Sequence, residues 1–125
     1  MRPIRTHAAR LALLLALFLE LLLAQSAVAQ ISPFRKTNAP QMNKADLAQL
    51  NDATQRLNEK NPAVVGSQES WQGDVSGTVR LDRIYRQRGT MCHAVSYRLH
   101  RATGATQVYR LNWCKAPDGS WKTVG

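Results

Sequence analysis

Basic side chains recur in the second half of the chain, and they are the residues best suited to binding a ligand. Arginine forks match carboxylate and phosphate groups. We expect an anion-binding surface made of Arg80, Arg98, Arg110, Lys122 and His100. The alternative is a solvated sheet face, whose long basic side chains only shield the strands beneath them.

The sequence shows no arrangement typical of a catalytic site. On one strand His93 and His100 point to opposite faces, so they cannot act together on a substrate. There is no GxSxG, HExxH or phosphate-loop motif. The acids Glu69, Asp74 and Asp82 do not have the spacing of a glycosidase pair. We expect no enzymatic activity and no catalytic residues. A hydrolase whose groups converge without a local motif is the alternative.

Cys92 and Cys114 are the only two cysteines, and in an exported chain they most simply form one disulfide. No CxxC is present, and His93 and His100 are the only histidines after residue 30. Four ligands with the spacing of a zinc site are therefore missing. We expect neither a metal nor another cofactor.

The two cysteines lie symmetrically about a turn at Ala102–Gly104. A three-residue hairpin loop there pairs Tyr97 with Tyr109 and Cys92 with Cys114. The cysteines then form a non-hydrogen-bonded pair, where side chains approach most closely and a cross-strand disulfide fits. Such a link stabilises the fold by about 3 kcal/mol in the chain-entropy model.

Two similar turns, at 87–89 and 117–119, extend this hairpin into an antiparallel meander. Counting outward from the turn at 87–89 places Leu81 opposite Val95 on the next strand. The predicted core face carries Val79, Leu81, Tyr85, His93, Val95, Tyr97, Leu99, Tyr109, Leu111, Trp113 and Trp121. The opposite face carries Arg80, Arg98, His100, Arg110, Asn112, Lys122 and the disulfide.

One amphipathic helix is predicted before the strands, over about residues 44–59. Asn43 is a good N-cap, and Asp46 stands where its side chain can bond back to that cap. Apolar residues recur at helical spacing, and Asn61-Pro62 ends the segment. A short strand that ends at Trp71 follows. The sequence thus predicts an α+β fold, with the helix packed on a small antiparallel β-meander that one cross-strand disulfide closes.

The first 29 residues have the three parts of a secretory signal peptide: a basic start, an apolar run and small residues before a cleavage point. A membrane anchor is the alternative, but the apolar run is short and contains Glu20. Residues 30–42 hold Pro33 and Pro40 and are predicted to be a flexible leader. Residues 43–125 would then form the single folded domain.

The chain after the signal peptide carries 14 basic and 7 acidic residues, a net charge of +7. A small basic protein attracts anionic surfaces through its summed field. Outside the cytoplasm these are acidic polysaccharides, lipid head groups, cell-wall polymers and host glycans, whereas nucleic acid is disfavoured. The charge also has a simpler explanation, as an aid to solubility.

Residues 64–86, Cys92, Cys114 and the closing segment Pro117–Trp121 together resemble the C-terminal domain of the bacterial 17-kilodalton surface-antigen family. The resemblance covers most of residues 45–124. It implies a cell-envelope protein exposed to host immunity, with antibodies among its partners and no established reaction. The chain lacks two usual features of the family, a lipid-modified cysteine after the signal and a glycine-rich segment.

These observations lead to one expected function and one alternative. We expect an exported, monomeric, non-enzymatic surface antigen, which binds an anionic envelope or host component through its basic sheet face. The expected location is the periplasm, the outer membrane or the outside of the cell. The alternative is a periplasmic inhibitor, or a chaperone-like partner of another envelope protein.

Overall fold

The computed structural model describes residues 16, 32–35, 37, 39, 41–102, 104 and 106–125. The expected signal peptide lies outside the described residues, apart from Ala16. Among the residues that are described, no helix has the length and apolar character needed to cross a membrane.

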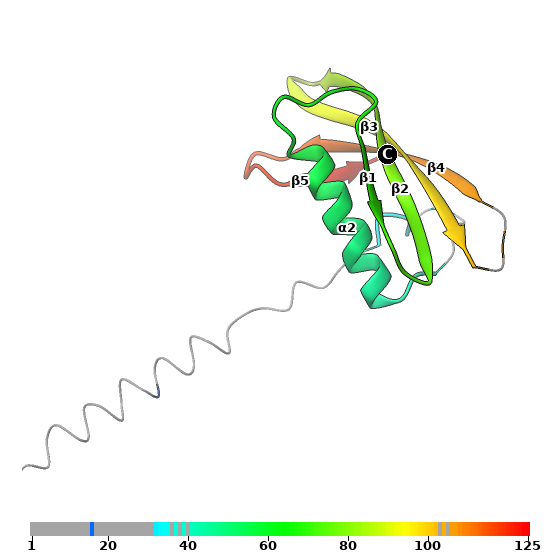
Figure 1. The fold of residues 1–125 in the computed structure, drawn as a ribbon. Helices are drawn as coiled ribbons and strands as arrows, with labels where there is room; N and C mark the ends of the chain where they lie inside the picture. The colour runs from blue at the N-terminus through cyan, green and yellow to red at the C-terminus, as the bar shows by residue number, and fades with distance from the viewer. Residues whose placement is uncertain are drawn as a thin grey trace, which may run out of the picture.

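One helix, α2 (Lys44–Asn58), packs on a five-stranded antiparallel sheet (Figure 1). The strands follow one another in the sheet in chain order, as a meander: β1 (Gln68–Trp71), β2 (Val75–Gln87), β3 (Thr90–Arg101), β4 (Gln107–Lys115) and β5 (Trp121–Val124). The helix lies against β1 and β2. The predicted fold class is therefore confirmed, including the disulfide.

The start of α2 shows how the helix is fixed to the sheet. The Asn43 side chain accepts a hydrogen bond from the Asp46 backbone N–H at 2.7 Å, so the predicted N-cap is correct. The Asp46 carboxylate does not bond back to the cap. It is buried and accepts from the Val75 backbone N–H at 2.9 Å, at the first residue of β2. This carboxylate thus joins the first turn of the helix to the sheet.

The core lies between α2 and the inner face of the sheet, and Tyr97 of β3 is at its centre. Tyr97 is fully buried, and its hydroxyl lies 2.9 Å from the Thr54 hydroxyl and 3.0 Å from the Trp113 indole nitrogen. Burial raises the pKa of this phenol well above its usual range. Around it pack Leu50, Ala53, Leu57, Trp71, Val75, Val79, Leu81, Val95 and Leu99.

The segment expected to be a flexible leader takes part in this core, since Phe34 is buried in it and partly buried Ala39 and Met42 pack against it. Phe34 is only 4% exposed, and its ring meets Tyr97 edge-on with centroids 5.0 Å apart. The ring of Tyr109, the cross-strand neighbour of Tyr97, lies 5.5 Å from the Phe34 ring. Phe34 therefore covers part of the inner face that α2 does not reach.

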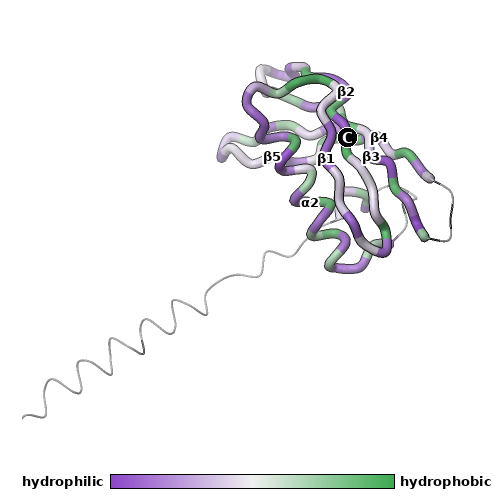
Figure 2. The backbone as a smooth tube through the Cα atoms, in the orientation of Figure 1, coloured by the Kyte–Doolittle hydropathy of each residue, from purple (hydrophilic) through white to green (hydrophobic). Residues whose placement is uncertain are grey.

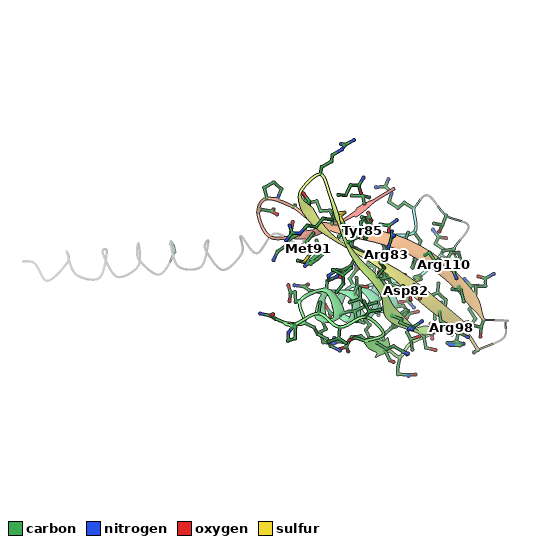
Figure 3. The ribbon with its side chains drawn as sticks, turned by 90° about the horizontal axis from the view of Figure 1, so that it is seen from above. Asp82, Arg83, Tyr85, Met91, Arg98 and Arg110 are labelled. Carbon is green, nitrogen blue, oxygen red and sulfur yellow. A yellow bond between two sulfur atoms is a disulfide. The ribbon has the colours of Figure 1, made fainter. Side chains whose placement is uncertain are left out.

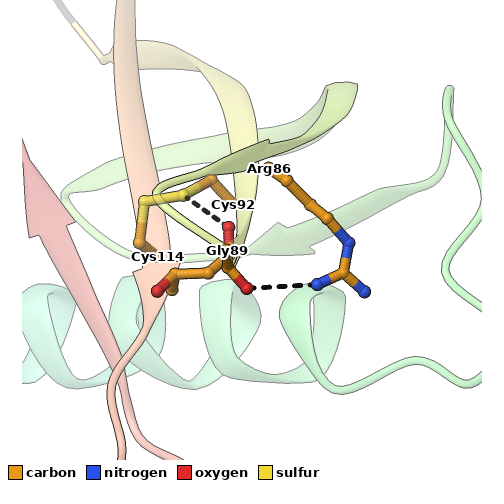
Figure 4. Close-up of a disulfide and its surroundings, with 5 residues drawn as sticks. Arg86, Gly89, Cys92 and Cys114 are labelled. Carbon is orange, nitrogen blue, oxygen red and sulfur yellow. Dashed lines mark hydrogen bonds between the residues drawn. A yellow bond between two sulfur atoms is a disulfide. The ribbon is translucent and has the colours of Figure 1, made fainter.

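The disulfide joins β3 to β4 where the sequence predicts it (Figure 4). Cys92 pairs with Cys114, and their Cα atoms are 4.1 Å apart, close to the spacing of a non-hydrogen-bonded pair. Tyr97 also pairs with Tyr109, so the whole predicted β3–β4 register is confirmed. Hydrophobic and hydrophilic residues are interspersed along these strands (Figure 2).

The β2–β3 turn differs from the prediction. It has two residues rather than three, Arg88 and Gly89, both with positive φ (52° and 76°). The extra residue lies instead within β2, where a bulge at Asp82 separates Leu81 from Arg83. Leu81 still pairs with Val95 as predicted. The last turn, at 117–119, has the predicted three residues, and Gly119 adopts a φ of 85°.

The bulge corrects the predicted position of Tyr85. Beyond it, Tyr85 pairs with Cys92 and Ile84 pairs with His93. Residues that pair directly share a face, and His93 lies on the inner one. Tyr85 is therefore on the side of the disulfide and not on the core face. The predicted three-residue turn places the extra residue in the loop, and the alternation of β2 is then unbroken.

Candidate anion-binding face

The sheet face turned away from α2, called the outer face below, brings three predicted site residues together. Arg80 of β2 and Arg110 of β4 both pair with Ser96 of β3, so they flank it across three strands as expected. Arg98 lies two residues further along β3, between Thr78 and Val108. All three arginines are exposed. Figure 3 shows Arg98 and Arg110 on their neighbouring strands.

The other two predicted residues, His100 and Lys122, lie toward opposite ends of this face. His100 pairs with Ser76, and its Nδ1 atom lies 2.8 Å from the Thr106 hydroxyl. Lys122 of β5 pairs with Cys114, beside the disulfide. At about 3.3 Å per residue, the eight intervals from Cys92 to His100 span roughly 26 Å. The three arginines form the middle of the face, and His100 and Lys122 lie toward its two ends.

The arginine cluster also contains a carboxylate that is not among the predicted site residues. Asp82 occupies the bulge in β2, and its Oδ1 atom accepts a hydrogen bond from the Ser96 hydroxyl at 3.2 Å. The same atom lies 3.6 Å from an Arg80 nitrogen. The Asp82 side chain remains 30% exposed. It therefore partly neutralises Arg80 while keeping access to solvent.

The bulge also adds Arg83 and Tyr85 to the outer face. Arg83 pairs with Ala94, and its guanidinium lies 4.6 Å from the centroid of the Tyr85 ring, a cation–π contact. This contact restricts the Arg83 side chain while its N–H groups keep free edges for an acceptor. In the sequence, the alternation of apolar residues is interrupted after Leu81, and this interruption is the sign of the bulge. Counting along the strand with a regular period of two passes over it.

The arginines of the outer face have fewer carboxylate neighbours than the basic residues in and just after α2. Arg56 and Lys60 both contact Glu69, at 3.3 and 3.1 Å, and chiefly the bond from Lys60 lowers the pKa of that carboxyl. In the described part of the chain, Arg80 is the one other cation within 4.0 Å of a carboxylate. Arg98 and Arg110 thus keep their charge for a partner.

His93 lies in the core and not on the outer face. It is 1% exposed, stacks on Trp121 with centroids 4.3 Å apart, and places Nδ1 2.8 Å from the Asn58 side-chain oxygen. Its Nε2 atom and the Asn58 amide nitrogen have no hydrogen-bond partner. His93 and His100 therefore lie on opposite faces of β3, as predicted, which argues against a shared catalytic role.

Burial of His93 predicts a pH-dependent stability. Burial lowers the pKa of His93 below its usual 6.5, so the unfolded chain binds more protons than the folded one in mildly acidic solution. The free energy of unfolding should fall as the pH drops below about 6.5. Denaturant titrations at pH 7.5 and 5 test this. His93→Gln should show a smaller fall than the parent, and exposed His100→Gln the same fall. An unaltered pH dependence in His93→Gln would contradict the assignment.

Within the described residues, no group of three or more histidine, cysteine, aspartate or glutamate side chains could hold a metal ion. Comparisons with protein-family models, with curated proteins and with solved structures find no match to this chain.

Proposed function

We propose that the chain is an exported, non-enzymatic envelope or surface protein that binds an anionic envelope or host component through its outer face. The main support is the cluster of Arg80, Arg98 and Arg110, which three adjacent strands present to solvent. The sheet sets the spacing of the backbone positions that carry these arginines before any ligand arrives. Cross-strand pairing thus lowers the ordering cost that flexible loops would add.

The disulfide and the leader sequence support the exported part of this proposal. Structural disulfides persist mainly in oxidising compartments, such as the periplasm and the cell exterior. The bond between Cys92 and Cys114 is in keeping with such a location. The basic and apolar start of the chain is typical of a secretory signal. The resemblance to the surface-antigen family points to the same location.

Reversing the three central charges should abolish most of the binding. We expect Arg80→Glu/Arg98→Glu/Arg110→Glu to weaken binding to heparin, used as a generic polyanion, roughly tenfold or more at low salt, because each attraction becomes a repulsion. The measurement is the dissociation constant of the purified protein at several salt concentrations. Binding of the parent should weaken steeply as salt rises.

A matched control separates a specific face from net charge. Lys44→Glu/Arg101→Glu/Lys115→Glu changes the net charge equally, and these exposed cations are not on the outer face. Lys44 begins α2, and Arg101 and Lys115 pair with the inner-face residues Val75 and Trp121. This variant should retain most of the heparin binding. Equal losses in both triple variants would contradict the proposal. A stoichiometric, salt-insensitive complex with one envelope protein would favour the inhibitor or chaperone alternative instead.

A further inference from the structure

The carboxylate of Asp82 restricts which anions suit the outer face. It lies within the arginine cluster, beside Arg80 and hydrogen-bonded to Ser96. A ligand that carries only negative charge gains from the arginines but is repelled by this group. A ligand that also carries hydroxyl groups can donate to the carboxylate, and hydrogen bonds to an ionised acceptor are among the strong ones. The mixture of charges therefore favours a ligand with both kinds of group.

The neighbouring residues extend the same chemistry along β2. Tyr85 follows Asp82 by three residues, a distance of about 10 Å along a strand. The Arg83 guanidinium lies over the half-buried Tyr85 ring, so it covers one face of that ring and keeps its own N–H edges exposed. An acidic sugar can place its charged group on this guanidinium. Two linked sugar units would cover this length of strand.

The apolar residues of the outer face do not suit insertion into a membrane. Six large hydrophobic side chains are exposed in the described part of the chain: Val64, Val65, Ile84, Met91, Val108 and Val124. By strand pairing, Val108 and Val124 are the members of this set on the outer face, opposite Arg98 and Asn112. Neither is aromatic, and interfacial insertion normally uses tryptophan, phenylalanine or leucine. A polymer that lies across the strands fits this surface better.

We infer, on the basis of the proposed function, that the ligand is an acidic polysaccharide. Its anionic groups bind Arg98 and Arg110, its hydroxyl groups donate to Asp82, and a further acidic group lies beside Arg83. Asp82 thereby determines specificity: it favours acidic sugars over polyanions that lack hydroxyl groups.

The test compares two polyanions on one variant. Polygalacturonate carries carboxylates and hydroxyls, whereas inorganic polyphosphate carries charge without hydroxyl donors. Asp82→Asn removes the negative charge and keeps the shape, so polyphosphate should bind more tightly. The ratio of the affinity for polygalacturonate to that for polyphosphate should fall about tenfold, because the charge-assisted hydrogen bonds are lost. Asp52→Asn, an exposed helix position with the same charge change, should leave the ratio unaltered.

The outcomes separate this inference from the proposed function. An unchanged ratio in Asp82→Asn, with binding still lost in the triple arginine variant, would overturn the polysaccharide inference alone. Tighter binding of the parent to phosphatidylglycerol vesicles than to polygalacturonate would also overturn it. If the parent binds none of these probes through the arginines, both proposals fail. Asp82→Ser serves as a second variant should asparagine disturb the bulge.

Discussion

Replacing Trp71 by alanine is expected to lower the free energy of unfolding by about 3–5 kcal/mol, the range for a buried large aromatic side chain. Trp71 is 3% exposed, at the end of edge strand β1. Its indole nitrogen donates to the Val75 carbonyl at 2.8 Å. The ring also fills the space above Gly77, where an added Cβ would lie 2.6 Å from its nearest ring atom. Truncation would therefore leave both a cavity and an unpaired buried carbonyl.

Denaturant titration of the purified domain measures this loss. Trp121→Ala is the matched control, because Trp121 lies on the other edge strand and is only half-buried against His93. The control should lose clearly less stability than Trp71→Ala. Small domains are stabilised by about 5–15 kcal/mol, so the loss at Trp71 would be a large fraction of the total. Equal losses at the two tryptophans would contradict the packing described here.

Removing the disulfide is expected to destabilise the domain by about 3 kcal/mol. The bond closes a loop between residues 22 positions apart, so its loss restores conformational freedom to the unfolded chain. Cys92→Ala/Cys114→Ala removes it without leaving a free thiol. Thermal unfolding should show a lower midpoint in this variant.

Reduction of the parent protein gives an independent check. The parent in excess reductant should lose nearly as much stability as the double variant does without it. The double variant should be insensitive to reductant, because no other cysteine exists in the chain. If the parent melts at the same temperature with and without reductant, the disulfide contributes little and the prediction is wrong.

Local sequence signals predicted most of the fold because they were redundant. The Thr103-Gly104 turn, the symmetric cysteines and the alternation of apolar residues all point to one pairing of β3 with β4. Changing that pairing by one residue would turn every side chain of a strand to the other face. The Asn43 cap and the proline after the helix likewise set its two ends to within one residue.

The bulge at Asp82 could not be predicted in this way. A three-residue turn with a regular strand and a two-residue turn with a bulge both accommodate one extra residue. The observed turn requires a positive φ at Arg88, a conformation that non-glycine residues rarely adopt. Local rules therefore favour the wrong choice, and the positions of Arg83 and Tyr85 follow from it.

Contacts distant in sequence were missed for a different reason. Phe34 belongs to a short, proline-containing segment with no periodicity, so nothing nearby predicts that it packs against Tyr97. Asp46 bonds to Val75, 29 residues away, instead of to its own helix cap. In both contacts the partner residue is determined by how the helix and the segment before it pack on the sheet. The candidate site shows the same limit: its arginines followed from strand register, but the contact of Asp82 with Ser96 did not.

The extra residue in β2 has one more consequence, for how this surface can change by mutation. Deleting a single codon at Asp82 would restore unbroken alternation. Arg83 would follow Leu81 directly and still pair with Ala94, so Arg83 and Tyr85 would stay on the outer face and Ile84 on the inner one. One deletion would thus remove the carboxylate from the arginine cluster while leaving the core and the neighbouring side chains in place.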